Sequence, residues 1–376
     1  MTCTQDAARS PFSAPGGIAP KYKILPIFLP HQGCPHHCIF CDQGTITGSP
    51  PRISIERISA AIAAFASSPL PSSVHPIRKE VAFYGSSFTA IPRHIQEAVL
   101  KPARQALDHG EIHGIRISTR PDACDAAALR LLKKYHVETV EVGVQSLDPE
   151  VLRRSGRGHS PEESSGAVTM LRDEGFITGV QLMPGLPGED RTSFDATMRM
   201  VLSLKPHVVR LYPALVLKGT PLESLYENGA YVPLTLDQAV ELCRDAVIVL
   251  RGSGIKVIRC GLQPTASLMR EGAVRAGPFH PAFGELVESA AAFECLNGAV
   301  RDLIASGGIT ESLWIQSAPR WFSILRGHQG RNLNLLRSLY PRTAFFFLQD
   351  PALPDHVIRI RSSSGTGMDI THPATC

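Results

Sequence analysis

The sequence predicts an α/β fold: a partial parallel barrel of the (β/α)6, TIM-like type, followed by a small C-terminal α/β domain. Short apolar runs alternate with stretches of helical periodicity between residues 24 and 259, a pattern typical of βαβ units and a parallel sheet. The chain of 376 residues is long enough for such a barrel, because α/β barrels of roughly 200–250 residues fold as one unit. Right-handed crossovers would wind six or more strands into a barrel or an open arc.

The first 260 residues contain a series of short runs with strand character. These expected strands are Ile24–Leu29, Glu80–Tyr84, Ile115–Ser118, Thr139–Val144, Ile177–Leu182, Val208–Tyr212 and Lys256–Arg259. Between them, apolar side chains recur at i, i+3 and i+4, which is the spacing of an amphipathic helix. The expected helices are Ile55–Phe65, Pro92–Asp108, Ala126–Tyr135, Asp148–Arg153, Pro161–Glu174, Ser193–Leu204 and Leu236–Leu250. In such sheets the chemistry lies at the C-terminal ends of the strands.

Changes in composition divide the chain into four parts. Ser, Pro, Gly and Ala dominate near the start, and Gly, Pro and His cluster shortly after residue 271, which is typical of flexible connections. We expect a flexible tail at residues 1–20, a core barrel at 21–271, a linker at 272–281 and a small α/β domain at 282–376. The last part is a candidate for substrate binding.

The C-terminal domain is expected to contain helices at Phe283–Ala305 and Asn332–Leu339 and strands at Leu313–Gln316, Thr343–Leu348 and Val357–Ile360. From Ser362 onward we expect a loose chain. Residues 301–376 contain eight Arg and no Lys. Trp314 and Trp321 could stack a base, while Arg326 and Arg331, ahead of a helix, could hold a phosphate. The alternative is a solvated face with a core tryptophan.

Composition argues against several classes of protein. Apolar residues make up 43% and charged residues 19%, an ordinary globular balance that disfavours long disorder and a fibrous protein. No apolar run approaches the ~18 residues of a membrane span, and the first twenty residues lack the basic and apolar regions of a secretory signal. We therefore expect a cytoplasmic protein with no membrane partner. The net charge of +4 permits nucleic-acid binding without demanding it.

Nine cysteines, an odd number in a large chain, argue against a disulfide framework. Cys34, Cys38 and Cys41 form a C-x3-C-x2-C cluster in the loop after the first expected strand. Three thiolates on one loop can hold three corners of a cubane iron–sulfur cluster and leave one iron open for a small molecule to chelate. The alternative is a structural zinc site, with His36 or His37 as the fourth ligand.

With Phe40 just before the third cysteine, this loop resembles the cluster loop of radical S-adenosylmethionine enzymes. The resemblance implies that Cys34, Cys38 and Cys41 bind a [4Fe-4S] cluster, and that S-adenosylmethionine chelates the open iron. An electron from the cluster would then generate a 5′-deoxyadenosyl radical that abstracts hydrogen from a substrate. The resemblance also implies that Phe40 lies by the adenine, and that a reducing partner such as flavodoxin or ferredoxin supplies the electron.

Further motifs follow the second and third expected strands. Gly85, Ser86 and Ser87 are similar to the family's glycine-rich motif, which grips the methionine amino group; a glycine there lets the backbone approach a ligand closely. The alternative is a plain Gly/Ser turn. Arg120 lies in a T-R-P-D string that resembles the radical-SAM subunit of Elongator, a tRNA wobble-uridine modification enzyme. It could face a carboxylate or form a surface ion pair. Ser118 replaces the Glu usual in that family.

The fourth and fifth expected strands carry the G-V-Q-S, R-G-H-S and M-P-G-L-P-G strings. These look like both the Elongator subunit and the oxygen-independent coproporphyrinogen oxidase group. On this resemblance, Gln145 and Gln181 lie near the ribose, and Arg157 pairs with the methionine carboxylate. The alternatives are a buried Gln in a backbone bond and a solvated Arg. For Glu141 and His159, the sequence does not decide between a functional and a structural role.

The resemblance covers roughly residues 22–262 and implies a radical S-adenosylmethionine enzyme whose first candidate substrate is a tRNA base. No acetyltransferase domain of the Elongator kind is expected, because the chain after residue 282 is short and lacks a clear acetyl-coenzyme-A phosphate loop. Two alternatives remain. One is a porphyrin- or haem-binding relative of the coproporphyrinogen oxidase group, and the other is a zinc-dependent RNA-binding module without radical chemistry.

Overall fold

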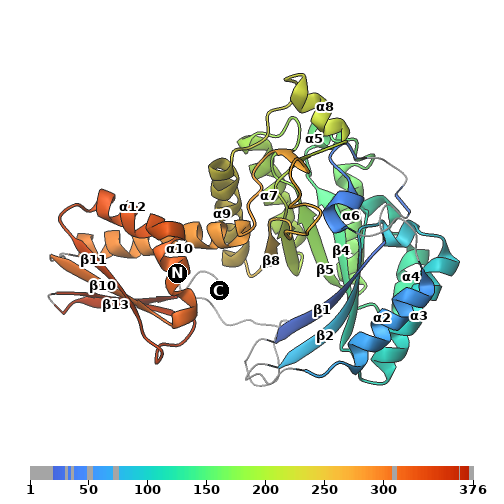
Figure 1. Cartoon of the computed structure of the whole chain (residues 1–376), viewed down its shortest axis with the longest axis horizontal. Helices are drawn as coiled ribbons and strands as arrows, with labels where there is room; N and C mark the ends of the chain where they lie inside the picture. Colours follow the sequence, from blue (N-terminus) through green and yellow to red (C-terminus); the bar gives the residue numbers. More distant parts are fainter. Residues whose placement is uncertain are drawn as a thin grey trace.

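The computed structural model describes residues 20–29, 33–34, 38–48, 54–70, 76–306, 311–363 and 365–371. Its largest element is a parallel sheet with the strand order β1-β2-β3-β4-β5-β6-β8. The sheet curls into a half-barrel with helices on its outer side (Figure 1). The predicted fold class is therefore confirmed. The strands are β1 Lys21–Phe28, β2 Ile77–Tyr84, β3 Gly114–Thr119, β4 Thr139–Gln145, β5 Ile177–Leu182, β6 Val208–Leu211 and β8 Lys256–Cys260.

The helices of this part are α1 Gln43–Thr47, α2 Ile55–Ser67, α3 Arg93–Asp108, α4 Ala126–Lys134, α5 Pro149–Arg154, α6 Pro161–Asp173, α7 Arg191–Leu204, α8 Pro221–Glu227 and α9 Leu236–Gly252. The seven helices predicted for this part are present within a few residues of their expected ranges, whereas α1 and α8 were not predicted. Most of the helices start at a residue whose side chain accepts from a free backbone N–H group; α3 and α8 lack such a cap. At the start of α6, the Ser160 side chain accepts from the Glu163 backbone N–H, and the Glu163 side chain accepts from the Ser160 backbone N–H. The same type of capping box, made by other residues, starts α7 and α9.

Side chains alternate along each strand between two environments. On the outer face, apolar residues such as Val81, Ile117 and Val142 pack with the helices in one continuous core. On the inner face, polar residues such as Glu141 and Arg210 recur, and they line the concave side of the half-barrel. Because side chains of a strand point to opposite faces in turn, the period-2 alternation of polar and apolar residues builds the outer core and the inner cavity together.

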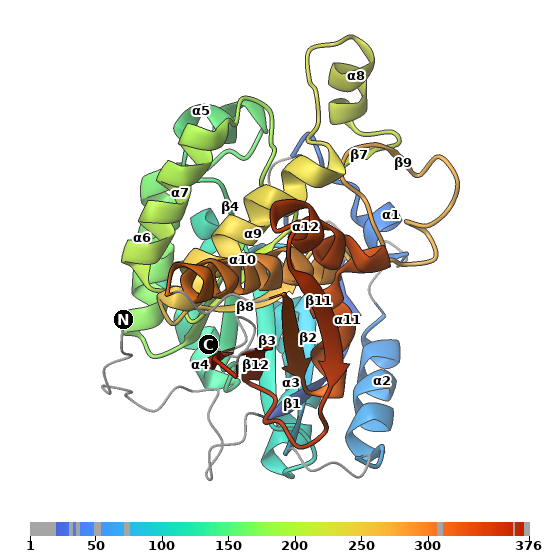
Figure 2. The ribbon, with the colours of Figure 1, turned by 90° about the vertical axis from the view of Figure 1, so that its left-hand side faces the viewer.

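The C-terminal part is a second, four-stranded sheet with the order β11-β10-β12-β13. Its strands are β10 Ser312–Ser317, β11 Ala344–Gln349, β12 Val357–Ser362 and β13 Gly367–Thr371, and its helices are α10 Phe283–Ala305, α11 Phe322–Arg326 and α12 Arg331–Leu339. Helix α10 packs on α9 with its first turns, through Phe283 and Val287. From Ala292 onward it belongs to the core of the second sheet. Figure 1 shows α10 reaching from α9 to the second sheet, and Figure 2 shows it from the side of the C-terminal part, next to α9 and α12.

Two local expectations about the end of the barrel and of the chain were incomplete. The chain after Ser362 is not loose where it is described, because β13 pairs antiparallel with β12. Within the segment expected to be a linker, β9 (Val274–Ala276) pairs with β7 (Val216–Leu217). The division into parts at 21–271, 272–281 and 282–376 stays a prediction, and the expected tail lies almost wholly outside the described residues. Within the described ranges, no helix combines the length and apolar character that crossing a membrane requires.

The turn after β5 contains a carboxyl group whose protonation depends on the fold. The Gly185 N–H donates to Glu189 Oε2 at 2.6 Å, but burial dominates and raises the pKa of Glu189 to about 8. Since this pKa lies above that of an unfolded Glu, the folded state favours the protonated carboxyl. Its contribution to stability is complete below the unfolded pKa and is lost as the pH rises toward 8.

We therefore expect the Glu189→Gln variant to gain stability relative to the wild type as the pH rises from about 5 to 8, with a slope of at most about 1.4 kcal/mol per pH unit. Glutamine keeps an acceptor for Gly185 but does not ionise. Urea unfolding midpoints at several pH values measure the difference. If the difference in unfolding midpoint between wild type and Glu189→Gln stayed the same over this pH range, Glu189 would already be ionised in the folded protein.

Candidate functional site: the mouth of the half-barrel

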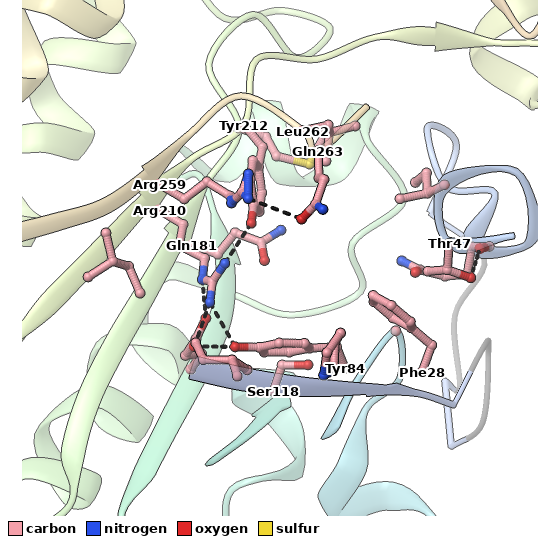
Figure 3. Close-up of a pocket in the computed structure, with 18 of the residues that line it drawn as sticks. Phe28, Thr47, Tyr84, Ser118, Gln181, Arg210, Tyr212, Arg259, Leu262 and Gln263 are labelled. Carbon is pink, nitrogen blue, oxygen red and sulfur yellow. Dashed lines mark hydrogen bonds and ion pairs between the residues drawn. The ribbon is translucent and has the colours of Figure 1, made fainter. Parts of the chain in front are cut away.

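The C-terminal ends of the parallel strands meet at one edge of the half-barrel, where the cysteine loop follows β1. Below this edge, a cavity of about 770 Å³ fills the concave side of the sheet. Tyr84, Gln181, Arg210 and Tyr212 point into this space from three strands (Figure 3). Cavities of this size are typical of small-molecule and cofactor sites, so the mouth of the half-barrel is the candidate site.

The three clustered thiols lie at this mouth. Cys34 Sγ is 3.4 Å from the Ser87 hydroxyl, Cys38 Sγ accepts from Arg157 Nη1 at 3.1 Å, and Cys41 Sγ accepts from Gln43 Nε2 at 3.5 Å. Cys41 also lines the cavity. The loop thus brings the predicted metal ligands together beside the cavity.

Burial works against ionisation of the Cys41 thiol. It raises the pKa of Cys41 to about 12, and the neighbouring Cys38 adds to the shift. A thiol must lose its proton to become a metal ligand, so thiols buried in this way bind strongly only to a group that brings positive charge. An iron–sulfur cluster held by thiolates fits this donor set.

Among the described residues, no three His, Cys, Asp or Glu side chains converge as they would around one metal ion. This spacing is compatible with a cubane, because each thiolate there binds a different iron and the sulfurs need not meet at one point. The zinc alternative needed His36 or His37, and both lie outside the described residues. It therefore stays a prediction.

Two buried guanidinium groups face Cys38, Arg120 from the end of β3 and Arg157 from the loop after α5. Arg157 also donates through Nη2 to the Gly143 carbonyl, and Arg120 Nη1 lies 3.8 Å from Cys38 Sγ. Arg120 pairs with Asp122, with 2.9 Å between Arg120 Nε and Asp122 Oδ1. Both guanidinium groups therefore place positive charge beside the Cys38 sulfur.

A neutral histidine orients one of these guanidinium groups. Arg157 Nε donates to His159 Nε2 at 3.2 Å, so the ring proton must lie on Nδ1, 3.1 Å from the Ser164 hydroxyl. Burial, with help from the charge of Arg157, lowers the pKa of His159 to about 4. The neutral ring therefore acts as an acceptor that fixes Arg157 against Cys38.

The residues predicted to hold the cosubstrate fall into two groups. Phe40, Gly85 and Gln181 line the cavity. Gly85 has a φ of 78°, which glycine adopts without strain. Ser86, Ser87, Arg120, Gln145 and Arg157 surround the cysteine loop or the strand ends beside it instead. Their predicted roles toward S-adenosylmethionine stay predictions.

Gln145 at the end of β4 has an unusual backbone. Its φ of 68° lies in a region that residues with a side chain rarely occupy, and its Oε1 accepts from Gln181 Nε2 at 3.3 Å. Gly143 makes this geometry possible, because a Cβ there would lie 2.9 Å from Gln145 Nε2. Such strained positions cluster at functional sites, which supports a binding role for the Gln145–Gln181 pair.

A charged network in the cavity floor was missed by the sequence reasoning. The buried Glu141 carboxylate on β4 accepts from Arg116 on β3 at 3.0 Å and from Arg210 on β6, and Tyr84 on β2 donates to it at 3.1 Å. Arg116 also pairs with Glu80. Arg116, Glu141 and Arg210 each stand between two apolar residues of their strand. Because alternate side chains of a strand point to opposite faces, this period-2 pattern is the signal that marks a polar inner face.

Comparison with known proteins agrees with this geometry. A family model described as the radical SAM superfamily matches residues 28–201, and a second, described as the radical SAM C-terminal domain, matches residues 206–292. The tRNA uridine(34) acetyltransferase of Methanocaldococcus jannaschii is 27% identical over 270 residues, which cover 62% of this chain and 49% of that protein. Elongator complex protein 3 of Homo sapiens is 27% identical over 283 residues, which cover 60% and 51%.

The fold has a counterpart among solved structures. The archaeal Elp3 of Methanocaldococcus infernus superimposes with a TM-score of 0.56 at 21% identity, covering 78% of this chain and 65% of that chain. The chain spans about half the length of the curated relatives it matches. With two successive family models over residues 28–292 and a cysteine loop at the mouth of a parallel half-barrel, this chain belongs to the radical S-adenosylmethionine superfamily and is an enzyme of that type.

Proposed function

We propose that Cys34, Cys38 and Cys41 hold a [4Fe-4S] cluster and that the protein uses S-adenosylmethionine to modify a base of tRNA. The observation that carries this proposal is the set of three thiols at the mouth of the cavity, with two buried arginines behind one of them. Such a cluster, when bound, would supply the electron that cleaves S-adenosylmethionine to methionine and a 5′-deoxyadenosyl radical. A small reducing protein, such as flavodoxin or ferredoxin, is the proposed source of the electron.

The residues of this chain have separable tasks in the proposed site. Arg157 and Arg120 stabilise the Cys38 thiolate, and Phe40 and Gly85 form the part of the cavity wall next to Cys41. Gly85 has no side chain to fill that space, so a ligand can approach the backbone closely. The protein thus binds and orients the reactants, while the hard chemistry belongs to the cofactor.

The substrate class rests on the named relatives. The curated relatives include tRNA uridine(34) acetyltransferases and Elongator complex protein 3, and the family models match the segment with the cysteine loop and the half-barrel. Acetyl transfer is not included in the proposal, because this chain aligns with only about half of each of those proteins. A tRNA base is therefore the proposed target of the radical.

Loss of one cluster ligand is the direct test. After anaerobic reconstitution with iron and sulfide, we expect the wild type to bind about four irons and to form 5′-deoxyadenosine when it is reduced with S-adenosylmethionine. In Cys38→Ala, we expect product formation to fall below detection, because one iron loses its thiolate. Iron analysis and chromatography of the product measure both effects.

Cys295→Ala is the matched control, since Cys295 lies on α10 in the C-terminal part and should leave iron content and product unchanged. Uptake of zinc alone would favour the zinc module, and haem binding in place of the cluster would favour the porphyrin relative. Either result would overturn the proposal. Comparison of modified nucleosides in tRNA from cells with and without the protein then tests the substrate.

A further inference from the structure

The C-terminal sheet has one covered face and one open face. Its covered face packs against α10, α11 and α12 through a core that includes Leu313, Ile315 and Ile360. In Figure 1, α10 and α12 lie together on one side of β10, β11 and β13. The alternate residues of the same strands point to the other side, where the Phe346 side chain is 46% exposed. We name this second side the aromatic sheet face and define it by Trp314, Phe346, Arg359 and Arg361.

Aromatic rings and guanidinium groups lie side by side on this face. Trp314 on β10 pairs with Phe346 on β11 and with Arg361 on β12. The Trp314 and Phe346 rings are stacked, with centroids 5.7 Å apart and an interplanar angle of 18°. Gly367 pairs with Arg361 on the far side, and its missing Cβ would lie 2.6 Å from Arg361 Cδ. The glycine therefore lets Arg361 lie across β13 and keeps this row of the face flat.

The second row adds charge to the same surface. Arg359 is the cross-strand neighbour of Gln316 and of Asp369. Arg359 and Arg361 share the single Asp369 carboxylate, at 3.1 and 3.2 Å, so this part of the face is positive overall. Residues 301–376 contain eight Arg and no Lys against five acidic residues. The surface therefore combines the exposed Phe346 ring and the half-buried Trp314 ring with a local excess of guanidinium groups.

We propose that the aromatic sheet face binds an unpaired stretch of RNA, with bases stacked on Trp314 and Phe346 and phosphates on Arg359 and Arg361. Base stacking on aromatic side chains of an open sheet, beside a positive backbone track, is the chemistry by which proteins hold single-stranded nucleic acid. The local excess of guanidinium groups favours a phosphate backbone as the occupant. The surface lies beyond residue 292, where the matched family models end.

The two tryptophans proposed from the sequence to stack a base lie on opposite sides of this sheet. Trp314 lies on the open face. Trp321 packs against the core on the covered side, and the Arg320 guanidinium lies 4.8 Å from the centroid of its ring. Only Trp314 is therefore expected to respond to RNA. The inference rests on the proposed function for the identity of the nucleic acid as RNA, but its geometry is independent of the cysteine loop.

The test measures binding of the full chain to a labelled, unstructured RNA of about ten nucleotides by fluorescence anisotropy. We expect the Phe346→Ala variant to bind roughly five- to one-hundred-fold more weakly, because one stacking platform is lost. Arg361→Gln is expected to reduce the salt slope of binding by about 0.7 between about 50 and 200 mM salt. Quenching of tryptophan fluorescence by RNA should persist in Trp321→Phe and disappear in Trp314→Phe.

Two matched controls isolate the rings and the charge. Leu348→Ala removes an apolar side chain from the same strand and face, and Arg337→Gln removes an arginine from α12 on the covered side. Neither should change the affinity more than twofold. Equal affinity of Phe346→Ala and wild type, equally tight binding of duplex RNA, or a change from dimer to monomer in Phe346→Ala would each overturn the inference. If the wild type forms 5′-deoxyadenosine but does not bind this RNA, only the proposal of an RNA-binding sheet face is wrong. If the wild type binds RNA but assembles no cluster, only the proposed function is wrong.

Discussion

Removal of the Glu141 carboxylate is expected to lower the free energy of unfolding by about 3–5 kcal/mol. The carboxylate lies between two guanidinium groups, with Glu141 Oε1 3.0 Å from both Arg116 Nη1 and Arg210 Nη2. All three side chains are shielded from water at the floor of the cavity. In Glu141→Ala, two buried guanidinium groups would lose their shared carboxylate partner in a site of low dielectric. The free-energy cost of these buried, poorly paired charges, more than the lost hydrogen bonds, sets the size of the effect.

The direction of the Glu141 pKa supports this reasoning. Burial alone would raise the pKa, but Arg210 and Arg116 outweigh it and hold the pKa of Glu141 below its ordinary value. Because the folded pKa is lowered, the stabilisation is present above the unfolded pKa and is lost as the pH falls through the folded pKa. The gap in stability between wild type and Glu141→Gln should therefore narrow on acidification.

Unfolding midpoints in guanidinium chloride measure this prediction. Glu141→Gln is close in volume to the wild type, so a loss similar to that of Glu141→Ala would identify charge, and not a cavity, as the cause. Adding Arg210→Met to Glu141→Gln should recover part of the stability, which a double-mutant cycle quantifies. Glu150→Ala, which removes an exposed partner of Arg153 and Arg154, should leave the midpoint unchanged. A Glu141→Ala midpoint equal to that of the wild type would refute the proposed importance of the network.

Much of the half-barrel could be predicted from the sequence because its signals are local. The strands are short, largely apolar runs. Helices such as α9 are recognisable from the spacing of their apolar residues and from an N-terminal capping residue. The strand β13 was missed because it carries only two apolar residues, Met368 and Ile370, in five positions. The β7–β9 pair was missed because strands of two and three residues are too short to show any periodicity.

The candidate site was predictable only where its residues are close in sequence. Cys34, Cys38 and Cys41 share one loop, so their spacing is visible directly. The contact between Arg157 and Cys38 joins residues 119 positions apart and depends on the strand order, which spacing does not contain. The same is true of Tyr84 and Arg210, which meet at Glu141 from different strands. Alternation of polar residues within single strands was the available signal, and it shows which face a residue takes but not its partner.

Loss of the Arg157 charge is expected to have the largest effect on the proposed chemistry, on the assumption that the cluster binds at the three cysteines. Arg157 is fully buried, so burial lowers its pKa, while the neighbouring Cys38 opposes that shift. A cationic group 3.1 Å from a ligand sulfur stabilises a cluster that has accepted an electron, because the reduced cluster carries more negative charge. In Arg157→Met, a substitution that keeps most of the side-chain length, we expect a more negative reduction potential and a roughly 10- to 100-fold slower formation of 5′-deoxyadenosine.

Arg157→Lys separates charge from geometry. A lysine keeps the positive charge but cannot reach Cys38, the Gly143 carbonyl and His159 at once, as the planar guanidinium does. We therefore expect its potential to lie near that of the wild type and its rate to lie between those of wild type and Arg157→Met. Redox titration followed by electron paramagnetic resonance measures the potential without reference to turnover, and iron analysis shows whether the cluster is present. Arg154→Met, which removes an exposed arginine paired with Glu150, is the control and should match the wild type in all three measurements. If Arg157→Met binds the cluster with an unchanged potential, the arginine serves only the packing of the strand ends, and the charge at Cys38 has no part in the reaction.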